Sequence, residues 1–420
     1  MPIKTLHLTN AYHSSSGGIR TMYRAMLAAA NAEQRPMRLV VPADASRVEA
    51  VGNYGRIYHV KAPRSPFIDS RYRLMLPHTF LQSRGSVRRI LEEEKPDLVE
   101  VCDKYSLCYL AGLLRRGWCE TIPRPTLVGL SCERLDDNVA AAISPASLGR
   151  RFARWYIGRI YAGQFDYHLA NSEYTARELA DNMWPKHWRD VHVIPMGVSL
   201  DGLGPHGRSE ALRADLRRRI GGTTADNITW LLYAGRLSVE KNLSLLVDML
   251  AQLDDARRTW RLVVAGDGPM AAAFRDDAAR RAPGRVLMWG HVAARDTLAQ
   301  LYASCDVFVH PNPHEPFGIA PLEAMASGIP LVAPAAGGLL SYASDGNAWL
   351  AEPTGQAFAT AVGAACQPGV RRAQRIACAR ATAARFDWTH VARVIFGVYD
   401  ALHARRMVPR DAPDALPVRC

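Results

Sequence analysis

Two glutamates separated by seven residues, Glu315 and Glu323, are the first side chains in this chain whose spacing suggests chemistry. Proline suits the first turn of a helix and glycine the position just after its end, so a short helix is predicted over residues 321–327, ended by Gly328. Glu315 then lies in the loop before the helix and Glu323 in its first turn. Free N–H groups at such a helix start bind phosphate. Carboxylates beside them suit sugar hydroxyls. The phosphate-binding N–H groups and the carboxylates together indicate a nucleotide sugar as ligand.

The whole run EPFGIAPLEAMASG, residues 315–328, carries more information than the bare spacing. The spacing alone also fits a solvated helix whose acidic residues complement the helix dipole. The full run resembles the E-x7-E motif of retaining glycosyltransferases of family four, which have the GT-B fold and include sucrose synthase and bacterial phosphatidylinositol mannosyltransferases. The resemblance implies that Glu315 is catalytic and holds hydroxyls of the transferred sugar, while Glu323 binds the ribose. It also places Phe317, Gly318 and Ile319 against the sugar or the phosphates.

A second motif with charged side chains is GRLSVEKN, residues 235–242, which contains Arg236 and Lys241. It follows a predicted strand over residues 230–234, at the carboxyl edge where α/β sheets bind ligands. As a bare pattern, two such cations are more often solvated. The segment resembles the Gly-Arg…Lys segment of the same family, which implies that Arg236 and Lys241 are catalytic and neutralise the departing diphosphate. No Asp-x-Asp motif occurs in the chain, so no metal ligands and no metal requirement are predicted.

A Gly17–Gly18 pair stands between a predicted strand over residues 3–9 and a predicted helix over residues 19–30. Glycine permits close approach of the backbone to a ligand. The pair alone is weak support for a site. The family has such a loop over the donor phosphates, so the resemblance assigns Gly17 and Gly18 to donor binding.

The acceptor side departs from the family pattern. Many members have a histidine at the end of a first-domain strand, whereas this chain has Ser131 and Cys132 there. Cys132, Glu133 and Asp136 are therefore the acceptor-side candidates, and a polar loop without a ligand is the alternative. His310 and His314, beside the main motif, are interpreted as solvated loop residues.

Apolar strands alternate with helical segments along the whole chain, which predicts parallel sheets covered by helices on both faces. The expected fold class is α/β, with two Rossmann-like domains facing across a cleft in the GT-B arrangement. Residues 1–198 are the expected acceptor-side domain and residues 199–385 the donor-side domain. By resemblance, a C-terminal helix over residues 386–406 returns to the first domain, and residues 407–420 form a tail.

Composition and net charge limit the kinds of partner that this protein is expected to bind. The chain has 420 residues, is 48% hydrophobic and carries a net charge of +12. Residues 1–200 hold 27 Lys and Arg against 19 Asp and Glu, which is +8 of that total. No nucleic-acid motif accompanies the charge, so nucleic acid is excluded. The run 147–161 mixes Arg with Trp, Tyr and Phe and suits an anionic membrane; a helix packed on the sheet with its arginines in solvent is the alternative.

The expected function is transfer of a sugar from a GDP- or UDP-sugar to a glycan or lipid-linked acceptor of the cell envelope. Neither a signal-peptide pattern nor a membrane-spanning run is present, so the expected location is the cytoplasm or the inner face of the membrane. Three alternatives remain: a non-catalytic sugar-nucleotide-binding protein, a nucleotide-sugar epimerase on the same fold, and a glycosidase. The glycosidase leaves Arg236, Lys241 and the glycine pair without a role.

Overall fold

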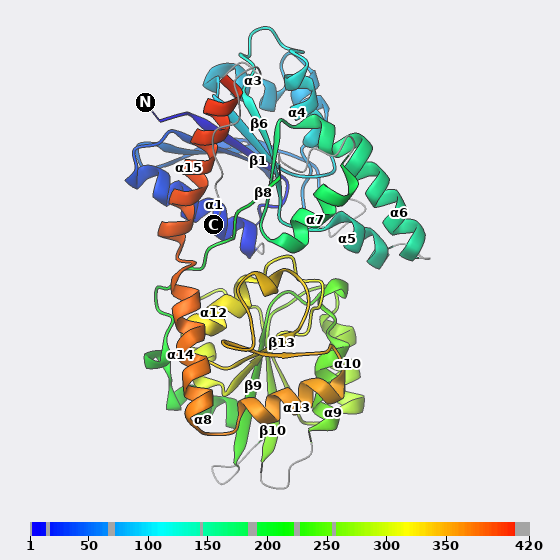
Figure 1. Cartoon of the computed structure of the whole chain (residues 1–420), viewed down its shortest axis with the longest axis vertical. Helices are drawn as coiled ribbons and strands as arrows, with labels where there is room; N and C mark the ends of the chain where they lie inside the picture. The colour runs from blue at the N-terminus through cyan, green and yellow to red at the C-terminus, as the bar shows by residue number, and fades with distance from the viewer. Residues whose placement is uncertain are drawn as a thin grey trace.

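Two α/β units lie one above the other along the long axis of the molecule (Figure 1). The computed structural model describes residues 2–13, 17–65, 72–142, 146–183, 191–221, 227–253 and 258–407. Ser14–Ser16, which precede the glycine pair, and the tail beyond residue 407 lie outside this described part. The two-unit α/β architecture expected from the sequence is confirmed.

The first unit is built on a sheet with the described strand order β3-β4-β2-β1-β5-β6-β7-β8. All neighbouring pairs are parallel except β3 and β4, which form an antiparallel hairpin. The expectation of a purely parallel sheet is therefore wrong at this edge. Gly52 permits the hairpin because its φ of 63° is one that other residues rarely adopt. The strands are β1 (Thr5–Thr9), β2 (Met37–Ala43), β3 (Arg47–Val51), β4 (Gly55–Lys61), β5 (Leu98–Cys102), β6 (Thr126–Ser131), β7 (Tyr167–Ala170) and β8 (Val191–Val193).

Helices cover both faces of this sheet and connect its parallel strands (Figure 1). The helix considered for run 147–161 is α6 followed by a π-helical turn, η1, which leads into a 3₁₀ turn, η2. Ser172 caps α7, as its sequence predicts, by accepting a hydrogen bond from the Thr175 N–H. The helices are α1 (Gly18–Ala32), α2 (His78–Leu81), α3 (Ser86–Glu94), α4 (Cys108–Arg115), α5 (Leu135–Ala142), α6 (Ala146–Tyr156), η1 (Ile157–Tyr161), η2 (Ala162–Gln164) and α7 (Glu173–Asn182).

The second unit has a wholly parallel sheet with the described order β11-β10-β9-β12-β13-β14. Its strands are β9 (Ile228–Ala234), β10 (Thr259–Ala265), β11 (Val286–Gly290), β12 (Val307–Val309), β13 (Leu331–Pro334) and β14 (Trp349–Ala351). Its helices and turns are η4 (Pro205–Gly207), α8 (Glu210–Arg219), η5 (Val239–Lys241), α9 (Ser244–Gln252), α10 (Ala271–Arg281), α11 (Arg295–Ser304), α12 (Ile319–Ser327), η6 (Gly338–Ser341), α13 (Gly355–Ala365) and α14 (Val370–Ala384).

Helix α15 (Trp388–Met407) crosses back from the second unit and packs against α1 of the first, which confirms the expected return (Figure 1). The chain passes between the units twice at one place, where the Val198 N–H donates to the Phe386 carbonyl at 2.7 Å and the Trp388 N–H to the Val198 carbonyl at 3.2 Å. Further along α15, the Tyr399 hydroxyl bonds the buried Glu100 carboxylate of β5. The two units are therefore joined at the crossing of the chain, and α15 is tied to the first unit along its length.

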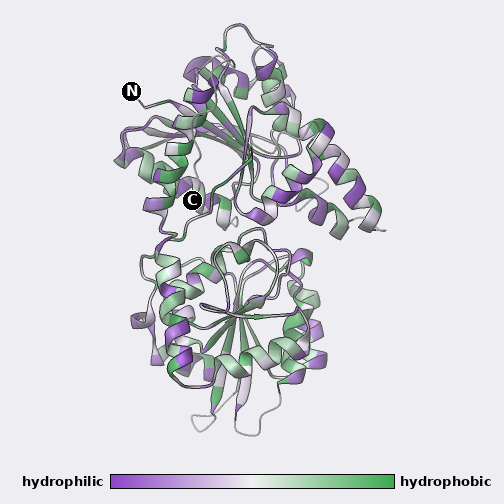
Figure 2. Cartoon of the chain, viewed as in Figure 1, coloured by the Kyte–Doolittle hydropathy of each residue, from purple (hydrophilic) through white to green (hydrophobic). Residues whose placement is uncertain are grey.

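Hydrophobic residues concentrate in the central strands, and hydrophilic residues lie mainly on the covering helices (Figure 2). Strand β9 is buried along its whole length, as expected for a strand covered on both faces. Within the described ranges, no helix combines the length and hydropathy needed to cross a bilayer.

Candidate active site

The centre of the candidate site is an ion pair between two of the predicted catalytic residues. Lys241 ends the short turn η5 after β9, and its Nζ donates to Glu315 Oε2 at 2.8 Å. Burial alone would raise the pKa of the Glu315 carboxyl, but Lys241 and His310 outweigh that effect and hold the pKa well below its usual range. Burial opposes the charge on Lys241 as well, and Glu315 more than compensates, so the pKa of Lys241 is raised. Both groups are therefore charged near neutral pH.

Two further side chains reach the same carboxylate oxygen. Asn312 Nδ2 donates to Glu315 Oε2 at 3.1 Å, and His310 Nε2 lies 3.4 Å from it. His310 is only 4% exposed, so its interpretation as a solvated loop residue is wrong. Its position directly after the buried strand β12 was the signal that could have identified it, because the carboxyl ends of parallel strands face the cleft. Asn312 follows the same strand.

Helix α12 starts two residues earlier than its sequence predicted, at Ile319 instead of Pro321. Gly318 makes this possible because its φ of 87° turns the chain sharply into the helix. Tyr342 holds that turn, with its hydroxyl 2.6 Å from the Gly318 carbonyl oxygen. The prediction that Glu323 lies in the first helical turn is therefore wrong, because the earlier start moves it into the second. The N–H groups at the start of α12 remain available for an anion.

Glu323 is partly buried against α11. Its Oε2 accepts a hydrogen bond of 3.0 Å from the Tyr302 hydroxyl. Burial raises the pKa of the Glu323 carboxyl, although the bond from Tyr302 and the charge of Arg295 oppose the rise. The two glutamates thus differ in their surroundings: Glu315 is fixed by a cation and Glu323 by a neutral hydroxyl.

Arg236 and the glycine pair lie where the two units meet. Arg236 Nη1 donates to the hydroxyl of Tyr72, a first-unit residue, at 2.9 Å. Gly18 is the first residue of α1, and a methyl group added there would lie 3.2 Å from the Ile319 side chain at the start of α12. The structure therefore brings Gly18 and Ile319, both predicted donor contacts, close together where the two units meet.

The acceptor-side candidates occupy different environments. Asp136 is buried and receives two hydrogen bonds from Arg134, at 2.9 and 2.8 Å, so its carboxylate is already paired. Glu133 accepts a hydrogen bond of 2.9 Å from Asn138, and burial is the main cause of its raised pKa. Glu133 lies in the segment between β6 and α5, and Asp136 lies in the first turn of α5, which contacts η5 of the second unit. Glu133 therefore has the more available carboxyl group of the two.

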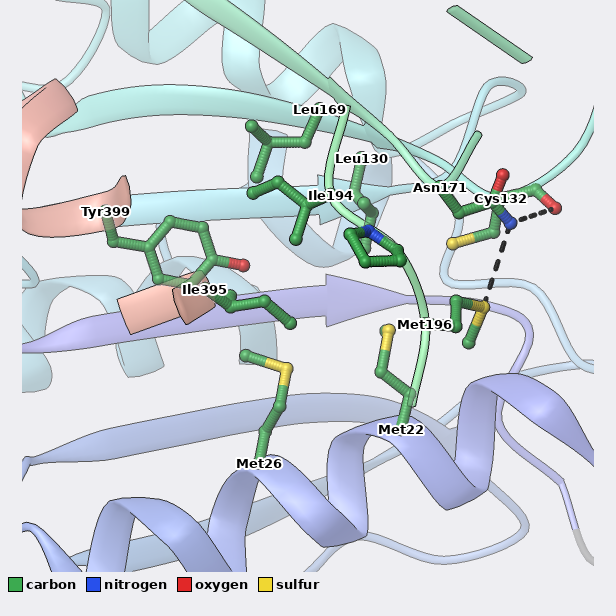
Figure 3. A pocket seen from close by; sticks show the side chains of 11 residues that line it. Met22, Met26, Leu130, Cys132, Leu169, Asn171, Ile194, Met196, Ile395 and Tyr399 are labelled. Atoms are coloured by element: carbon green, nitrogen blue, oxygen red, sulfur yellow. Dashed lines mark hydrogen bonds between the residues drawn. The ribbon is translucent and has the colours of Figure 1, made fainter. Parts of the chain in front are cut away.

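Cys132 faces an apolar pocket behind the cleft (Figure 3). Asn171 Nδ2 donates to the Cys132 carbonyl oxygen at 3.3 Å. Residues from α1, the ends of β6 and β7, the segment after β8 and helix α15 line this pocket: Met22, Met26, Leu130, Cys132, Leu169, Asn171, Ile194, Pro195, Met196, Ile395 and Tyr399. Its apolar lining suits packing of α15 better than recognition of a polar acceptor.

Comparison with known proteins assigns the family. The family model described as Glycosyltransferase Family 4 matches residues 16–201, and the one described as Glycosyl transferases group 1 matches residues 229–367. The chain belongs to glycosyltransferase family 4. The two matches cover the two units, and the second includes Arg236, Lys241, Glu315 and Glu323 of this family 4 glycosyltransferase.

Individual relatives support the assignment. The chain is 29% identical over 401 residues to the GDP-mannose-dependent alpha-(1-6)-phosphatidylinositol dimannoside mannosyltransferase of Mycobacterium tuberculosis, covering 95% of this chain and 97% of the relative. It is 34% identical over 240 residues to the D-inositol 3-phosphate glycosyltransferase of Xylanimonas cellulosilytica. That match covers 55% of this chain and 57% of the relative.

Solved structures show the same fold. The Anabaena protein HepE, solved with UDP and glucose, matches at a TM-score of 0.67 and 20% identity over 95% of this chain and 100% of that one. Sucrose-phosphate synthase from Thermosynechococcus elongatus matches at a TM-score of 0.72 and 19% identity. The match covers 96% of this chain and 100% of that one. The family 4 chain therefore has the GT-B fold expected from its sequence.

Proposed function

We propose that this glycosyltransferase moves a mannosyl group from GDP-mannose to a lipid-linked glycan acceptor at the cytoplasmic face of the cell envelope, with retention of anomeric configuration. The observation that carries the proposal is the Glu315 cluster: a carboxylate held by Lys241, Asn312 and His310 beside the start of α12. A carboxylate fixed by several donors suits the orientation of sugar hydroxyls. The relative that covers most of the chain is named as GDP-mannose-dependent, which supports the choice of donor.

The roles of the other residues follow from their positions. The N–H groups at the start of α12 would bind the donor phosphates from one side and the Gly17–Gly18 loop from the other. Arg236 and Lys241 would neutralise the charge that builds on the departing diphosphate, so that no metal is needed. Glu323 would hold the ribose hydroxyls, and Glu133 would be an acceptor contact.

An unpartnered buried atom also supports a ligand here. His310 Nδ1 is buried and has no hydrogen-bond partner among the described residues. Buried polar atoms usually have one, so a bound ligand would supply what the protein does not. His310 thus adds to Glu315 a second polar group facing the proposed sugar.

Thermal-shift measurements with GDP-mannose, UDP-glucose and ADP-glucose test the donor. A ligand at one hundred times its Kd adds about 2.7 kcal/mol to stability, so GDP-mannose should raise Tm well above the other two. Stabilisation by UDP-glucose alone would contradict the assignment of the base. Product formation with phosphatidylinositol mannoside acceptors, followed by NMR of the new anomeric centre, tests transfer and retention. Donor binding without product on any acceptor would favour the non-catalytic alternative.

A further inference from the structure

Helix α6 of the first unit exposes an apolar face instead of burying it. Leu148, Phe152 and Trp155 are 58%, 53% and 53% exposed. Their spacing of four and three residues places them on one side of the helix. Ala153 and the following Ile157 are fully buried and attach the opposite side to the core. Phe152 and Trp155 are therefore exposed, whereas Tyr161, at the end of run 147–161, is fully buried in the core. The helix is packed on the unit with its arginines in solvent, as the alternative interpretation of the sequence expected, but it leaves these two rings uncovered.

The exposed aromatic rings continue from α6 to α4. The Phe152 ring lies 6.0 Å from the Trp155 ring and 6.4 Å from that of Tyr156, measured between centroids. The Tyr156 hydroxyl lies 3.2 Å from the hydroxyl of Tyr109, which is 40% exposed and belongs to the first turn of α4. We call Leu148, Phe152, Trp155, Tyr156 and Tyr109 the aromatic face. It extends from the outer side of α6 to the first turn of α4, the helix that follows β5.

Positive charge accompanies the aromatic face. Arg150 and Arg151 are exposed, and no acidic side chain in the described part of the chain pairs with either. Arg154 is 54% exposed and lies 3.7 Å from the Asp136 carboxylate. Figure 2 shows hydrophilic and hydrophobic segments alternating along α6, and Figure 1 shows α5 and α6 projecting from the side of the unit. Exposed Trp, Phe and Leu with flanking arginines are typical of helices that lie in a membrane interface.

We propose that the aromatic face docks on an anionic lipid bilayer, with Phe152 and Trp155 among the headgroups and Arg151, one turn before Trp155, on lipid phosphates. An exposed apolar patch also suits a protein partner. Arg151, which is beside it and has no acidic partner among the described residues, favours an anionic surface, because it gains from that charge without losing an internal partner. The docking places the acceptor side of the cleft at the membrane. That consequence rests on the proposed lipid-linked acceptor, whereas the docking itself does not.

Co-sedimentation of the full-length protein with vesicles tests the proposal without an activity assay. Wild type should bind vesicles of phosphatidylcholine with 30% phosphatidylglycerol and bind pure phosphatidylcholine much less. Arg151→Gln should weaken partitioning about fivefold, since an arginine near such a surface contributes about 1 kcal/mol and 1.4 kcal/mol is tenfold. The matched control is Val370→Ser with Arg371→Gln on α14, where Val370 is 73% exposed. It should bind as wild type does.

A second measurement reports insertion. Vesicles with brominated acyl chains should quench part of the tryptophan fluorescence of wild type, and Trp155→Phe should lose that quenching while it keeps most of its binding. Absence of binding to anionic vesicles at low salt, or equal binding by the arginine variant, would overturn the docking. Quenching that Trp155→Phe does not change would overturn the assigned face. A protein that binds vesicles and turns over no donor would leave the docking intact and contradict the proposed function instead.

Discussion

The Ser172 hydroxyl, at the start of α7 in the first unit, donates a hydrogen bond of 2.5 Å to the Pro316 carbonyl oxygen in the second. Pro316 directly follows Glu315, so the first unit contacts the loop that presents the central carboxylate. A second bridge lies beside it, because the Tyr174 hydroxyl is 3.0 Å from His314 Nδ1. The Glu315 loop is therefore positioned by both units, and its geometry depends on how closely they approach.

Tyr174→Phe tests this dependence. The substitution removes the hydroxyl that contacts His314 and Asp137 but keeps the ring that packs on Arg134. We expect the KM for the donor to rise about fivefold, because a neutral hydrogen bond contributes about 1 kcal/mol net. Steady-state kinetics at saturating acceptor measure it. Tyr54→Phe, in the hairpin at the far edge of the sheet, is the matched control, and an equal effect there would show that the bridge has no specific role.

Arg236→Ala and Lys241→Ala should each lower kcat by about 10² to 10³, because each removes a preorganised cation from the leaving diphosphate. Lys241→Ala should cost more in stability, since it leaves Glu315 buried without its ion pair. Single-turnover rates and urea unfolding separate the two effects. The controls are Arg218→Ala and Lys61→Ala, which replace exposed cations outside the cleft. Normal turnover in both site variants would refute the catalytic assignment.

The sequence predicted the α/β architecture well because strand and helix signals are local. The short, fully apolar segment Trp230–Ala234, followed at once by Gly235, indicated a buried strand, and Gly328 marked the end of α12. The β3–β4 hairpin was missed because β3 is mostly exposed and lacks an apolar pattern. The start of α12 was misplaced because proline is tolerated anywhere in a first turn, while the decisive feature was the positive φ of Gly318.

The site was predictable only where a motif marked it. Arg236, Lys241 and Glu315 belong to recognisable motifs, whereas Asn312 and Tyr72 contribute through contacts between segments far apart in the chain. No spacing rule predicts that a tyrosine of the first unit meets an arginine of the second. The exposure of Phe152 and Trp155 was equally hidden, because an amphipathic pattern does not show which face a helix buries.

Removal of divalent metal should leave donor turnover within about twofold of the untreated enzyme, because we assign charge neutralisation at the diphosphate to Arg236 and Lys241. The measurement is turnover after dialysis against EDTA, with a metal-dependent glycosyltransferase treated in parallel to show that chelation is complete. Loss of activity that Mg²⁺ or Mn²⁺ restores would contradict the assignment of charge neutralisation to Arg236 and Lys241. If Lys241→Ala kept wild-type turnover after the same EDTA treatment, that result would also contradict the role assigned to Lys241.

His168, in β7, makes the stability of the first unit depend on pH. Burial lowers its pKa to about 4, against the more usual 6.5, and its Nε2 lies 3.1 Å from the Ala162 carbonyl oxygen. Below pH 6.5 the unfolded chain binds a proton at this residue and the folded chain does not, so stability falls as pH decreases from 6.5 to about 4. The loss over this range is about 3 kcal/mol, at 1.36 kcal/mol per pKa unit.

His168→Gln should remove that part of the dependence. Urea unfolding of wild type and variant, measured between pH 7 and pH 4, gives the difference in free energy of unfolding at each pH. Carboxylates titrate in the same range but contribute alike to both proteins, so the difference isolates the histidine. We expect wild type to lose stability relative to the variant as pH falls, whatever the difference between their free energies of unfolding at pH 7. His206→Gln, an exposed histidine of the second unit, is the control and should follow wild type. Parallel curves for wild type and His168→Gln would show that the imidazole can take up its proton inside the folded unit without cost.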